Sequence, residues 1–89
     1  MIEIIYTNKF EKYFDLLPNS IKKKALKKIK LFEQQPFSPI LRTEKLRSFE
    51  NIWSFRIDKK YRVIFSFIGS RKAIFYLIGH HHWVYKLLK

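Results

Sequence analysis

Three stretches rich in β-branched and aromatic residues, separated by only three residues each, constrain the fold of this chain most strongly. They span residues 52–57, 61–68 and 72–78. The connecting triplets 58–60 and 69–71 contain Asp, Lys, Gly and Ser, and their length suits antiparallel hairpins. The sequence therefore predicts a three-stranded antiparallel meander near the C-terminus. Other elements must cover at least one face of such a sheet.

The segments before the meander supply the elements that cover it. Residues 2–6 form an apolar, β-branched run that predicts a strand, and Thr7-Asn8 is suited to end a strand and cap a helix. Two helical patterns follow, with Pro18 between them and Asn19 or Ser20 as the cap of the second. Their apolar positions are Phe10, Tyr13, Phe14 and Leu17, and then Ile21, Ala25, Leu26, Ile29 and Phe32.

This order of elements predicts an α+β fold, in which an N-terminal strand and two helices pack on an antiparallel sheet that ends in the three-stranded meander. Between the second helix and the meander, residues 36–51 show no clear period and contain Pro36 and Pro39. We expect them to form a connection across the surface. Loops of that length in compact domains are commonly functional or disordered.

The chain length supports one domain, residues 1–89, because so short a chain cannot build two cores. There is no cysteine, which excludes disulfide frameworks, thiolate metal sites and cysteine nucleophiles. The N-terminus lacks a secretory pattern, and the longest apolar stretch is far shorter than the roughly 20 residues that span a membrane. We therefore expect a soluble, cytoplasmic protein without a membrane partner.

The excess of positive charge limits the classes of partner that this chain can attract. Nineteen Lys and Arg against seven Asp and Glu give a net charge of +12, so an acidic partner is expected. Nucleic acid, an acidic protein segment and an anionic membrane all satisfy that field. Six lysines lie in the second helix, where a solvated face is the simplest interpretation, although the patch also attracts RNA over a distance. They are Lys22, Lys23, Lys24, Lys27, Lys28 and Lys30.

Two arginines are the first candidates for a functional role. Side chains alternate along a strand, so Arg56 projects from the face opposite to Phe55 and Ile57. By the same rule Arg62 projects from the face opposite to Val63. If helices cover one face, these arginines lie on the open one and can attract a phosphate. Arginines are also common on half-exposed sheets without any such role.

The segment after the last strand holds His80, His81, His82 and Tyr85. Three histidines suggest a metal, but neighbouring residues on a strand point in alternating directions, and no Cys or helical His pair accompanies them. We therefore expect no metal and no cofactor. A histidine near neutral pKa, a tyrosine and arginines on one sheet face instead favour an acid/base and phosphate-binding site.

Three motifs together resemble the signature strands of the RelE/ParE toxin superfamily. They read Trp-Ser-Phe-Arg-Ile at 53–57, Tyr-Arg-Val-Ile-Phe at 61–65 and Gly-His-His-His-Trp-Val-Tyr at 79–85. Residues 42–46, Arg-Thr-Glu-Lys-Leu, resemble the acidic loop of the YoeB branch. The resemblance covers nearly the whole chain in element order.

The resemblance implies an endoribonuclease that cleaves mRNA, typically at the ribosomal A site, and a cognate antitoxin that neutralises it. The net charge of +12 and the aromatic content also predict an acidic antitoxin that wraps the domain and folds on binding, which would give a toxin–antitoxin hetero-oligomer. The partners expected are thus an acidic antitoxin, mRNA and the ribosome.

By position, Arg62 resembles the family's phosphate-binding arginine, and Arg56 matches a basic position on the preceding strand. His81 and Tyr85 match a His or Arg and the terminal tyrosine of the last motif. Glu44 aligns with the general-base glutamate of the YoeB branch, although an exposed loop glutamate needs no function. Two departures stand out: His82 replaces an aspartate of many relatives, and Ser54 replaces a lysine of RelE itself.

These residues give a mechanism in which Glu44 or a neutral histidine accepts the proton of the ribose 2′-hydroxyl. Arg56 and Arg62 stabilise the charge on phosphorus-bound oxygens, and protonated His81 donates to the leaving 5′-oxygen. Tyr85 stacks on a base or orients the phosphate. Two alternatives remain: a ParE-like inhibitor of DNA gyrase without catalysis, and a basic RNA-binding module without activity.

Overall fold

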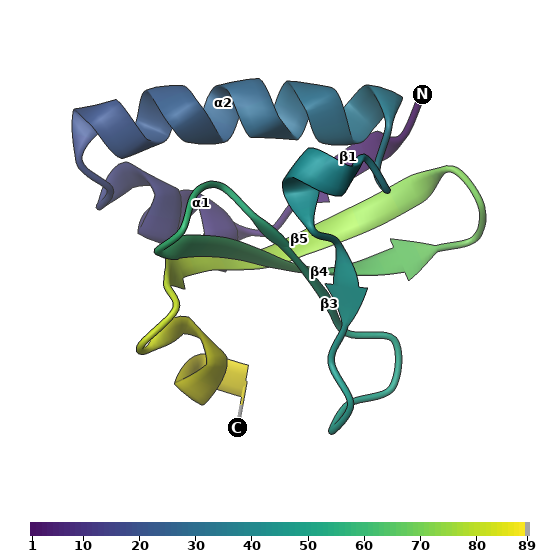
Figure 1. Cartoon of the computed structure of the whole chain (residues 1–89). Coiled ribbons are helices and arrows are strands. Elements are labelled where there is room, and N and C mark those ends of the chain that lie inside the picture. The colour runs from purple at the N-terminus through teal and green to yellow at the C-terminus, as the bar shows by residue number, and fades with distance from the viewer. Residues whose placement is uncertain (89) are drawn as a thin grey trace.

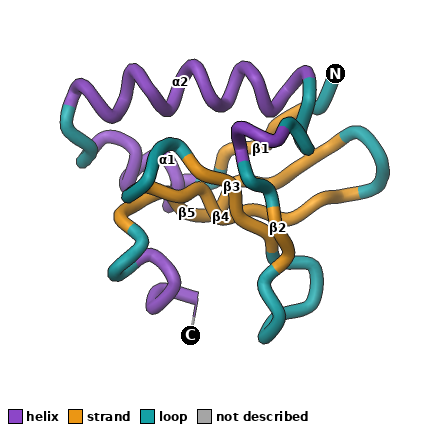
Figure 2. The backbone as a smooth tube through the Cα atoms, in the orientation of Figure 1, coloured by secondary structure: helices purple, strands orange, loops and turns teal. Residues whose placement is uncertain are grey.

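The computed structural model describes residues 1–88 and shows two helices packed on one face of a five-stranded sheet (Figures 1 and 2). Lys89, the last residue of the expected domain, lies outside the described residues. The elements are β1 (Glu3–Tyr6), α1 (Asn8–Asp15), α2 (Asn19–Gln34), η1 (Pro39–Leu41), β2 (Glu44–Lys45), β3 (Trp53–Arg56), β4 (Tyr61–Ile68), β5 (Lys72–His80) and η2 (Val84–Leu88).

The predicted α+β class and the C-terminal meander are confirmed, with one difference in the sheet. The strand order is β1-β5-β4-β3-β2. The meander β3-β4-β5 is antiparallel, but β1 pairs with β5 in parallel. The sheet is therefore mixed. The two helices form the connection between β1 and the meander, and a connection of this length allows β5 to run in the same direction as β1.

The first helix begins as its sequence predicts. The Thr7 side chain accepts a hydrogen bond from the backbone N–H of Phe10, and its hydroxyl donates to the carbonyl of Phe75 on β5 at 2.9 Å. The cap of α2 differs from the prediction. The helix already includes Asn19, and Pro18 holds the cap position without a side-chain hydrogen bond. The fixed φ of proline is compatible with the helix start, so no polar cap is needed.

Aromatic rings fill the space between the helices and the sheet. The ring centroid of Phe32 on α2 lies 4.9 Å from those of Phe55 and Phe65 and 5.4 Å from that of Phe75. All four side chains are fully buried. Because these residues come from one helix and three strands, this aromatic cluster fixes α2 over the centre of the sheet.

The connection 36–51 is more ordered than its sequence suggests. It contains the short helix η1, whose Leu41 is fully buried, and the two-residue strand β2, which pairs with β3 at the sheet edge. Two residues are too short for an alternating pattern to appear in the sequence. None of the helices in the described part of the chain is both long and apolar enough to cross a membrane.

The C-terminal segment covers part of the sheet face that we expected to be open. Ile64, Leu77 and Val84 form a second buried apolar cluster on that face, and η2 packs against it. The last motif is therefore not a continuous strand. β5 ends at His80, and residues 84–88 turn into the short helix η2 instead.

Candidate functional site

Two arginines face each other on neighbouring strands. Arg56 of β3 and Arg62 of β4 are direct cross-strand partners, and both project from the face opposite to the helices, as alternation predicts. Like charges placed opposite one another on antiparallel strands destabilise a sheet. An anion bound beside Arg56 and Arg62 would therefore relieve the repulsion between their charges.

Arg62 is nearly buried, with 9% of its surface exposed. Its Nη1 donates to the backbone carbonyls of Asp58, Lys59 and Tyr61 at 3.0, 3.1 and 3.2 Å, which fixes the guanidinium against the β3–β4 turn. Within residues 1–88, the structure has one ion pair, Lys24–Asp58 at 3.5 Å, so no carboxylate neutralises Arg62 there. Buried charges are rarely left without a partner.

Asp58 shapes the turn that holds Arg62. Its Oδ1 accepts hydrogen bonds from the backbone N–H groups of Lys60 and Tyr61 at 2.8 and 2.9 Å, and its Oδ2 pairs with Lys24 on α2. Partial burial acts to raise the pKa of Asp58, but these N–H donors and Lys24 outweigh it and lower the pKa. The turn is thus tied to α2 by a carboxylate that is ionised near neutral pH.

The three histidines gather where β5 ends. Their ring centroids lie 4.8 Å apart for His80–His81, 4.7 Å for His80–His82 and 4.3 Å for His81–His82. The backbone N–H of His81 donates to the Lys60 carbonyl at 2.7 Å, so the cluster is bound to the turn that also holds Arg62. The ring of Tyr61 meets that of His80 edge-on at 5.5 Å.

The pKa values of His80 and His81 both lie below the usual histidine value. For His81 the causes are partial desolvation, then the other two histidines, then Arg62 and Arg56. For His80 they are desolvation, His82, Lys60 and Arg62, partly offset by Asp58. The contribution of both arginines shows that the histidine cluster and the arginine pair share one electrostatic environment. Neutral imidazoles, which can accept a proton, therefore dominate at neutral pH.

Glu44 lies on the same face as the arginines, but at the edge of the sheet. It is exposed on β2 opposite Ser54, which places it diagonally from Arg56 at about 7–8 Å between Cα atoms. Three strand spacings, about 14 Å, separate β2 from β5 and its histidines. The arginines thus lie between Glu44 on one side and the histidines on the other.

Tyr85 shares the arginine face but lies in a different environment. It is half-buried in η2, where its ring packs against the apolar cluster of Ile64, Leu77 and Val84. The structure thus brings together Arg56, Arg62 and the histidines, while Glu44 and Tyr85 lie at the margins.

The sequence reasoning missed two parts of this site. It treated His80 and His82 as neighbours of His81, not as one cluster with it. It also read residues 58–60 only as a turn, although an Asp that opens a turn commonly accepts from the N–H two residues on. Gly79 adds a third constraint, since a Cβ there would collide with the Trp83 ring, which covers the strand beside Arg62.

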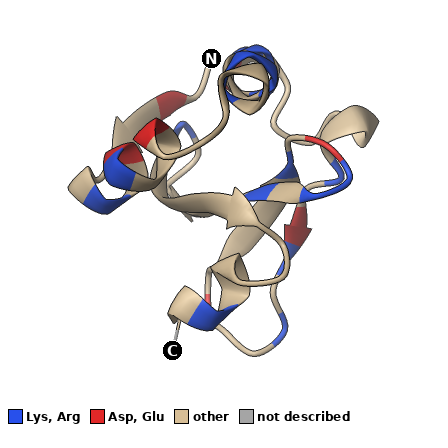
Figure 3. Cartoon of the chain, turned by 90° about the vertical axis from the view of Figure 1, so that its left-hand side faces the viewer, with Lys and Arg blue, Asp and Glu red and all other residues tan. Residues whose placement is uncertain are grey.

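Basic residues dominate the surface around these elements. Figure 3 shows Lys and Arg along α2, seen end-on, and over the turns, with few Asp and Glu among them. The net charge of +12 is therefore distributed broadly, and the arginine pair lies within a positive field that extends beyond the site itself.

Comparisons with known sequences and structures bear on the family and the fold. A family model described as a ParE-like toxin domain matches residues 19–83. No curated protein sequence shows a significant match.

Several solved toxin structures share the fold. A YoeB/ParE toxin from Agrobacterium tumefaciens is 18% identical with a TM-score of 0.75, over 90% of this chain and 99% of that one. The RelB-RelE antitoxin–toxin complex from Methanococcus jannaschii is 21% identical with a TM-score of 0.72, over 96% of this chain and 99% of that one. An archaeal RelE-RelB complex from Pyrococcus horikoshii is 16% identical with a TM-score of 0.75, over 93% of this chain and 98% of that one.

Proposed function

Since the chain belongs to the ParE-like toxin domain family, within the RelE/ParE toxin superfamily, we propose that this toxin is an endoribonuclease that cleaves mRNA without a metal. One observation carries the proposal: a cross-strand pair of arginines, one of them nearly buried and without a carboxylate partner in residues 1–88, lies beside a histidine cluster. Oriented guanidinium donors next to a proton-transfer group suit phosphodiester cleavage.

In the proposed reaction, a base removes the proton of the ribose 2′-hydroxyl, and the oxygen attacks the adjacent phosphorus. The bond to the 5′-oxygen breaks, which leaves a 2′,3′-cyclic phosphate and a 5′-hydroxyl. Arg56 and Arg62 donate to the phosphoryl oxygens as negative charge develops on them. A planar guanidinium matches that geometry better than an ammonium does.

Two assignments of the proton transfers follow from the site. In one, Glu44 is the base and protonated His81 donates to the leaving oxygen, with the bound phosphate raising the His81 pKa. In the other, neutral His81 is the base and the leaving oxygen takes its proton from water. The lowered pKa of His81 supports the second assignment, because it leaves the ring neutral at neutral pH. Tyr85, at the margin, would orient RNA by stacking.

The decisive experiment is expression of the intact chain in a bacterium, followed by mapping of transcript ends. Cuts in translated messages, absent from an Arg56→Ala variant, are the expected result. Cuts only within the translated frame would indicate cleavage on the ribosome. If Glu44→Gln keeps the full cleavage rate from pH 5 to 8, a histidine is the base.

A second function, non-catalytic inhibition of DNA gyrase, has the description of the matching family model in its favour. It predicts growth arrest without new transcript ends. A gyrase supercoiling assay with the purified chain separates the two functions, since the nuclease leaves supercoiling unchanged.

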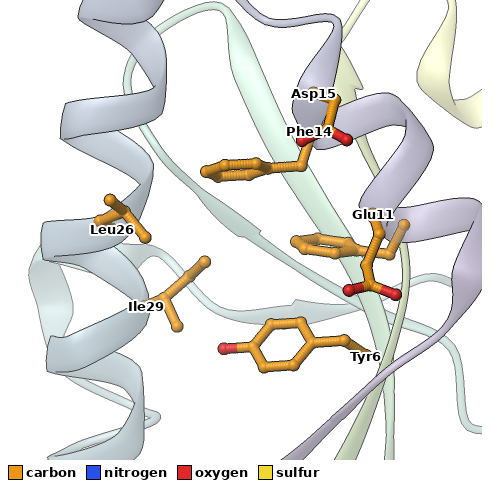
Figure 4. Close-up of a pocket in the computed structure, with 7 residues that line it drawn as sticks. Tyr6, Glu11, Phe14, Asp15, Leu26 and Ile29 are labelled. Atoms are coloured by element: carbon orange, nitrogen blue, oxygen red, sulfur yellow. The ribbon is translucent and has the colours of Figure 1, made fainter.

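We also propose an acidic antitoxin as the partner, and the helices offer it an apolar groove. A cavity of about 250 Å³ between α1 and α2 is lined by Tyr6, Phe14, Leu26 and Ile29 among others, with Glu11 and Asp15 at its side (Figure 4). Leu26 is 59% exposed there. Because the two carboxylates would repel an acidic segment, the antitoxin's apolar residues would enter this groove, and its carboxylates would meet the lysines elsewhere.

Removing the Leu26 side chain tests the groove. Leu26→Ser should weaken the complex with the product of the adjoining reading frame at least tenfold, since truncating an anchor that fills a pocket at the centre of an interface costs about 2 kcal/mol or more. Leu16→Ser is the matched control, because Leu16 is equally apolar and 70% exposed but does not line the groove. Equal affinities for the two variants would place the antitoxin elsewhere.

A further inference from the structure

The histidine cluster has a geometry that its proposed role in proton transfer does not require. All three histidines of the chain lie in it, and their candidate ligand nitrogens are within 4.8 Å of one another. Alternation along a strand would separate them, but β5 ends at His80, and the following turn returns His81 and His82 to the same side. Proton transfer needs only one of these rings.

We propose that His80, His81 and His82 together bind one divalent transition-metal ion, with Cu²⁺ bound more tightly than Zn²⁺. Imidazole nitrogens suit both ions, and the order follows the general ranking of divalent first-row metals. Three protein ligands leave further coordination positions for water.

The distances are compatible with this site after a small rearrangement. With metal–nitrogen bonds of about 2.0–2.1 Å, tetrahedral ligands lie about 3.3 Å apart. The nitrogens must therefore close from at most 4.8 Å by about 1.5 Å or less. His80 and His81 are half-exposed and His82 is exposed, so side-chain rotations suffice and the backbone can keep its place.

One hydrogen bond must be exchanged for the metal. The backbone N–H of His82 donates to Nδ1 of His80 at 3.2 Å. Ligation through Nδ1 displaces this bond directly, and ligation through Nε2 moves the ring proton to Nδ1, which also breaks it. A single exposed hydrogen bond of this length contributes little to stability, and three metal–nitrogen bonds outweigh it.

The surrounding charge selects the kind of metal. Lys60, Arg62 and Arg56 lie close enough to influence the histidines, with Asp58 as the one opposing charge among these neighbours. A positive environment disfavours Mg²⁺ and Ca²⁺, which also require oxygen ligands that this cluster does not offer. A metal that binds nitrogen strongly is needed to overcome the repulsion.

If the proposed nuclease function is correct, metal binding would also silence it, because a coordinated His81 can neither accept nor donate a proton. This consequence rests on the proposed function, whereas the metal site does not. The two are therefore tested by separate measurements.

The test is titration of the full-length chain, without an added tag, with CuCl2, ZnCl2 and MgCl2 in a calorimeter. We expect one equivalent of Cu²⁺, weaker binding of Zn²⁺ and no binding of Mg²⁺. His80→Asn and His82→Asn should each weaken Cu²⁺ binding by at least tenfold, since even outer partners of metal ligands commonly contribute ten- to hundredfold. The triple His→Asn variant should lose it.

Two further measurements keep the inference open to refutation. Lys60→Gln removes a neighbouring charge without removing a ligand and should bind Cu²⁺ at least as tightly as the unaltered chain. Electron paramagnetic resonance of the unaltered Cu²⁺ complex should show nitrogen ligands from three imidazoles, whether or not the variants fold. Undiminished Cu²⁺ affinity in the triple variant, or a spectrum with fewer imidazoles, would overturn the proposal.

Discussion

On the helix side of the sheet, the buried side chains of β3, β4 and β5 are aromatic or aliphatic, and they pack around Phe32. On the other side, the same strands bury Ser54, Arg62 and Ser66, which are three of the four buried polar residues of the described chain. A smaller apolar cluster under η2 covers only part of that face. The same strands therefore stabilise the fold on one face and hold unneutralised charge on the other.

This contrast explains how so small a domain can hold a destabilising site. Cross-strand repulsion between Arg56 and Arg62 has a cost, and the aromatic cluster behind them offsets it. Substitutions on the two faces should therefore separate stability from activity.

The largest effect is expected from Phe32→Ala. Removing a fully buried ring that meets Phe55, Phe65 and Phe75 should lower the free energy of unfolding by about 3–5 kcal/mol. Phe37→Ala is the control, because Phe37 is 61% exposed and, within residues 1–88, meets only the Trp53 and Phe67 rings, so its loss should change the value by about 1 kcal/mol. Denaturant unfolding of both variants measures the difference. Similar losses for the two would mean that the aromatic cluster does not dominate the core.

The next effect concerns activity on the opposite face. Arg56→Ala and Arg62→Ala should each slow RNA cleavage by about 100- to 1000-fold, through the lost transition-state donor. Only Arg62→Ala should also reduce stability, by about 1–3 kcal/mol, because three turn carbonyls lose their donor. Lysine at either position keeps the positive charge but lacks the planar, bidentate donor geometry of a guanidinium, and should restore little activity.

Parallel assays of cleavage and unfolding distinguish these roles. An Arg62→Ala variant that cleaves RNA at the normal rate and merely unfolds more easily would make this arginine a structural residue of the turn. The proposed site would then lose its buried cation.

How well the sequence predicts each face of the sheet depends on how many residues the underlying sequence pattern extends over. The helix side follows from repeated patterns, since the apolar positions from Ile21 to Phe32 and the alternation in β3 and β4 each persist over several residues. The orientation of Arg56 and Arg62 follows from the same alternation. Long, regular signals thus suffice for the layers and for the placement of the arginines.

The remaining features depend on contacts that leave no local pattern. β2 has two residues, and η2 lies where the last motif suggested more strand. The histidine cluster forms because β5 stops at His80, and the close fit of Trp83 over Gly79 is a tertiary contact. Sequence alone could propose His81 as a site residue, but not that all three rings meet.

Asp58 lies at the boundary between the two faces, and a moderate effect is expected there. Asp58→Ala should cost about 1–2 kcal/mol, because the N–H groups of Lys60 and Tyr61 lose a charged acceptor. It should also lower the cleavage rate, since the same turn fixes Arg62. Asp15→Ala, on an exposed position of α1, is the control and should change neither quantity. Loss of stability with an unchanged rate would separate the turn from the site.

The smallest effect is a dependence of stability on pH that originates in the histidine cluster. The pKa values of His80 and His81 are lowered from 6.5, first by desolvation and then by neighbouring positive charge. Between the lowered values and 6.5 the unfolded chain binds more protons than the folded chain, so stability rises with pH in this window. Acidification below about pH 6.5 should therefore destabilise the fold, and the loss should level off below the folded-state values.

Asp58 provides a separate window for comparison. Its pKa is lowered from 3.8, so its contribution to stability is present above that value and is lost only as the pH falls further. Thermal unfolding from pH 3 to 8 should show both windows in the unaltered chain. The double variant His80→Asn with His81→Asn should flatten the upper window alone. Asp58→Asn should flatten the lower window and slightly widen the upper one, because the Asp58 charge partly offsets the lowering of the His80 pKa. An upper window that persists without the two histidines would show that their crowding with the arginines does not strain the folded state.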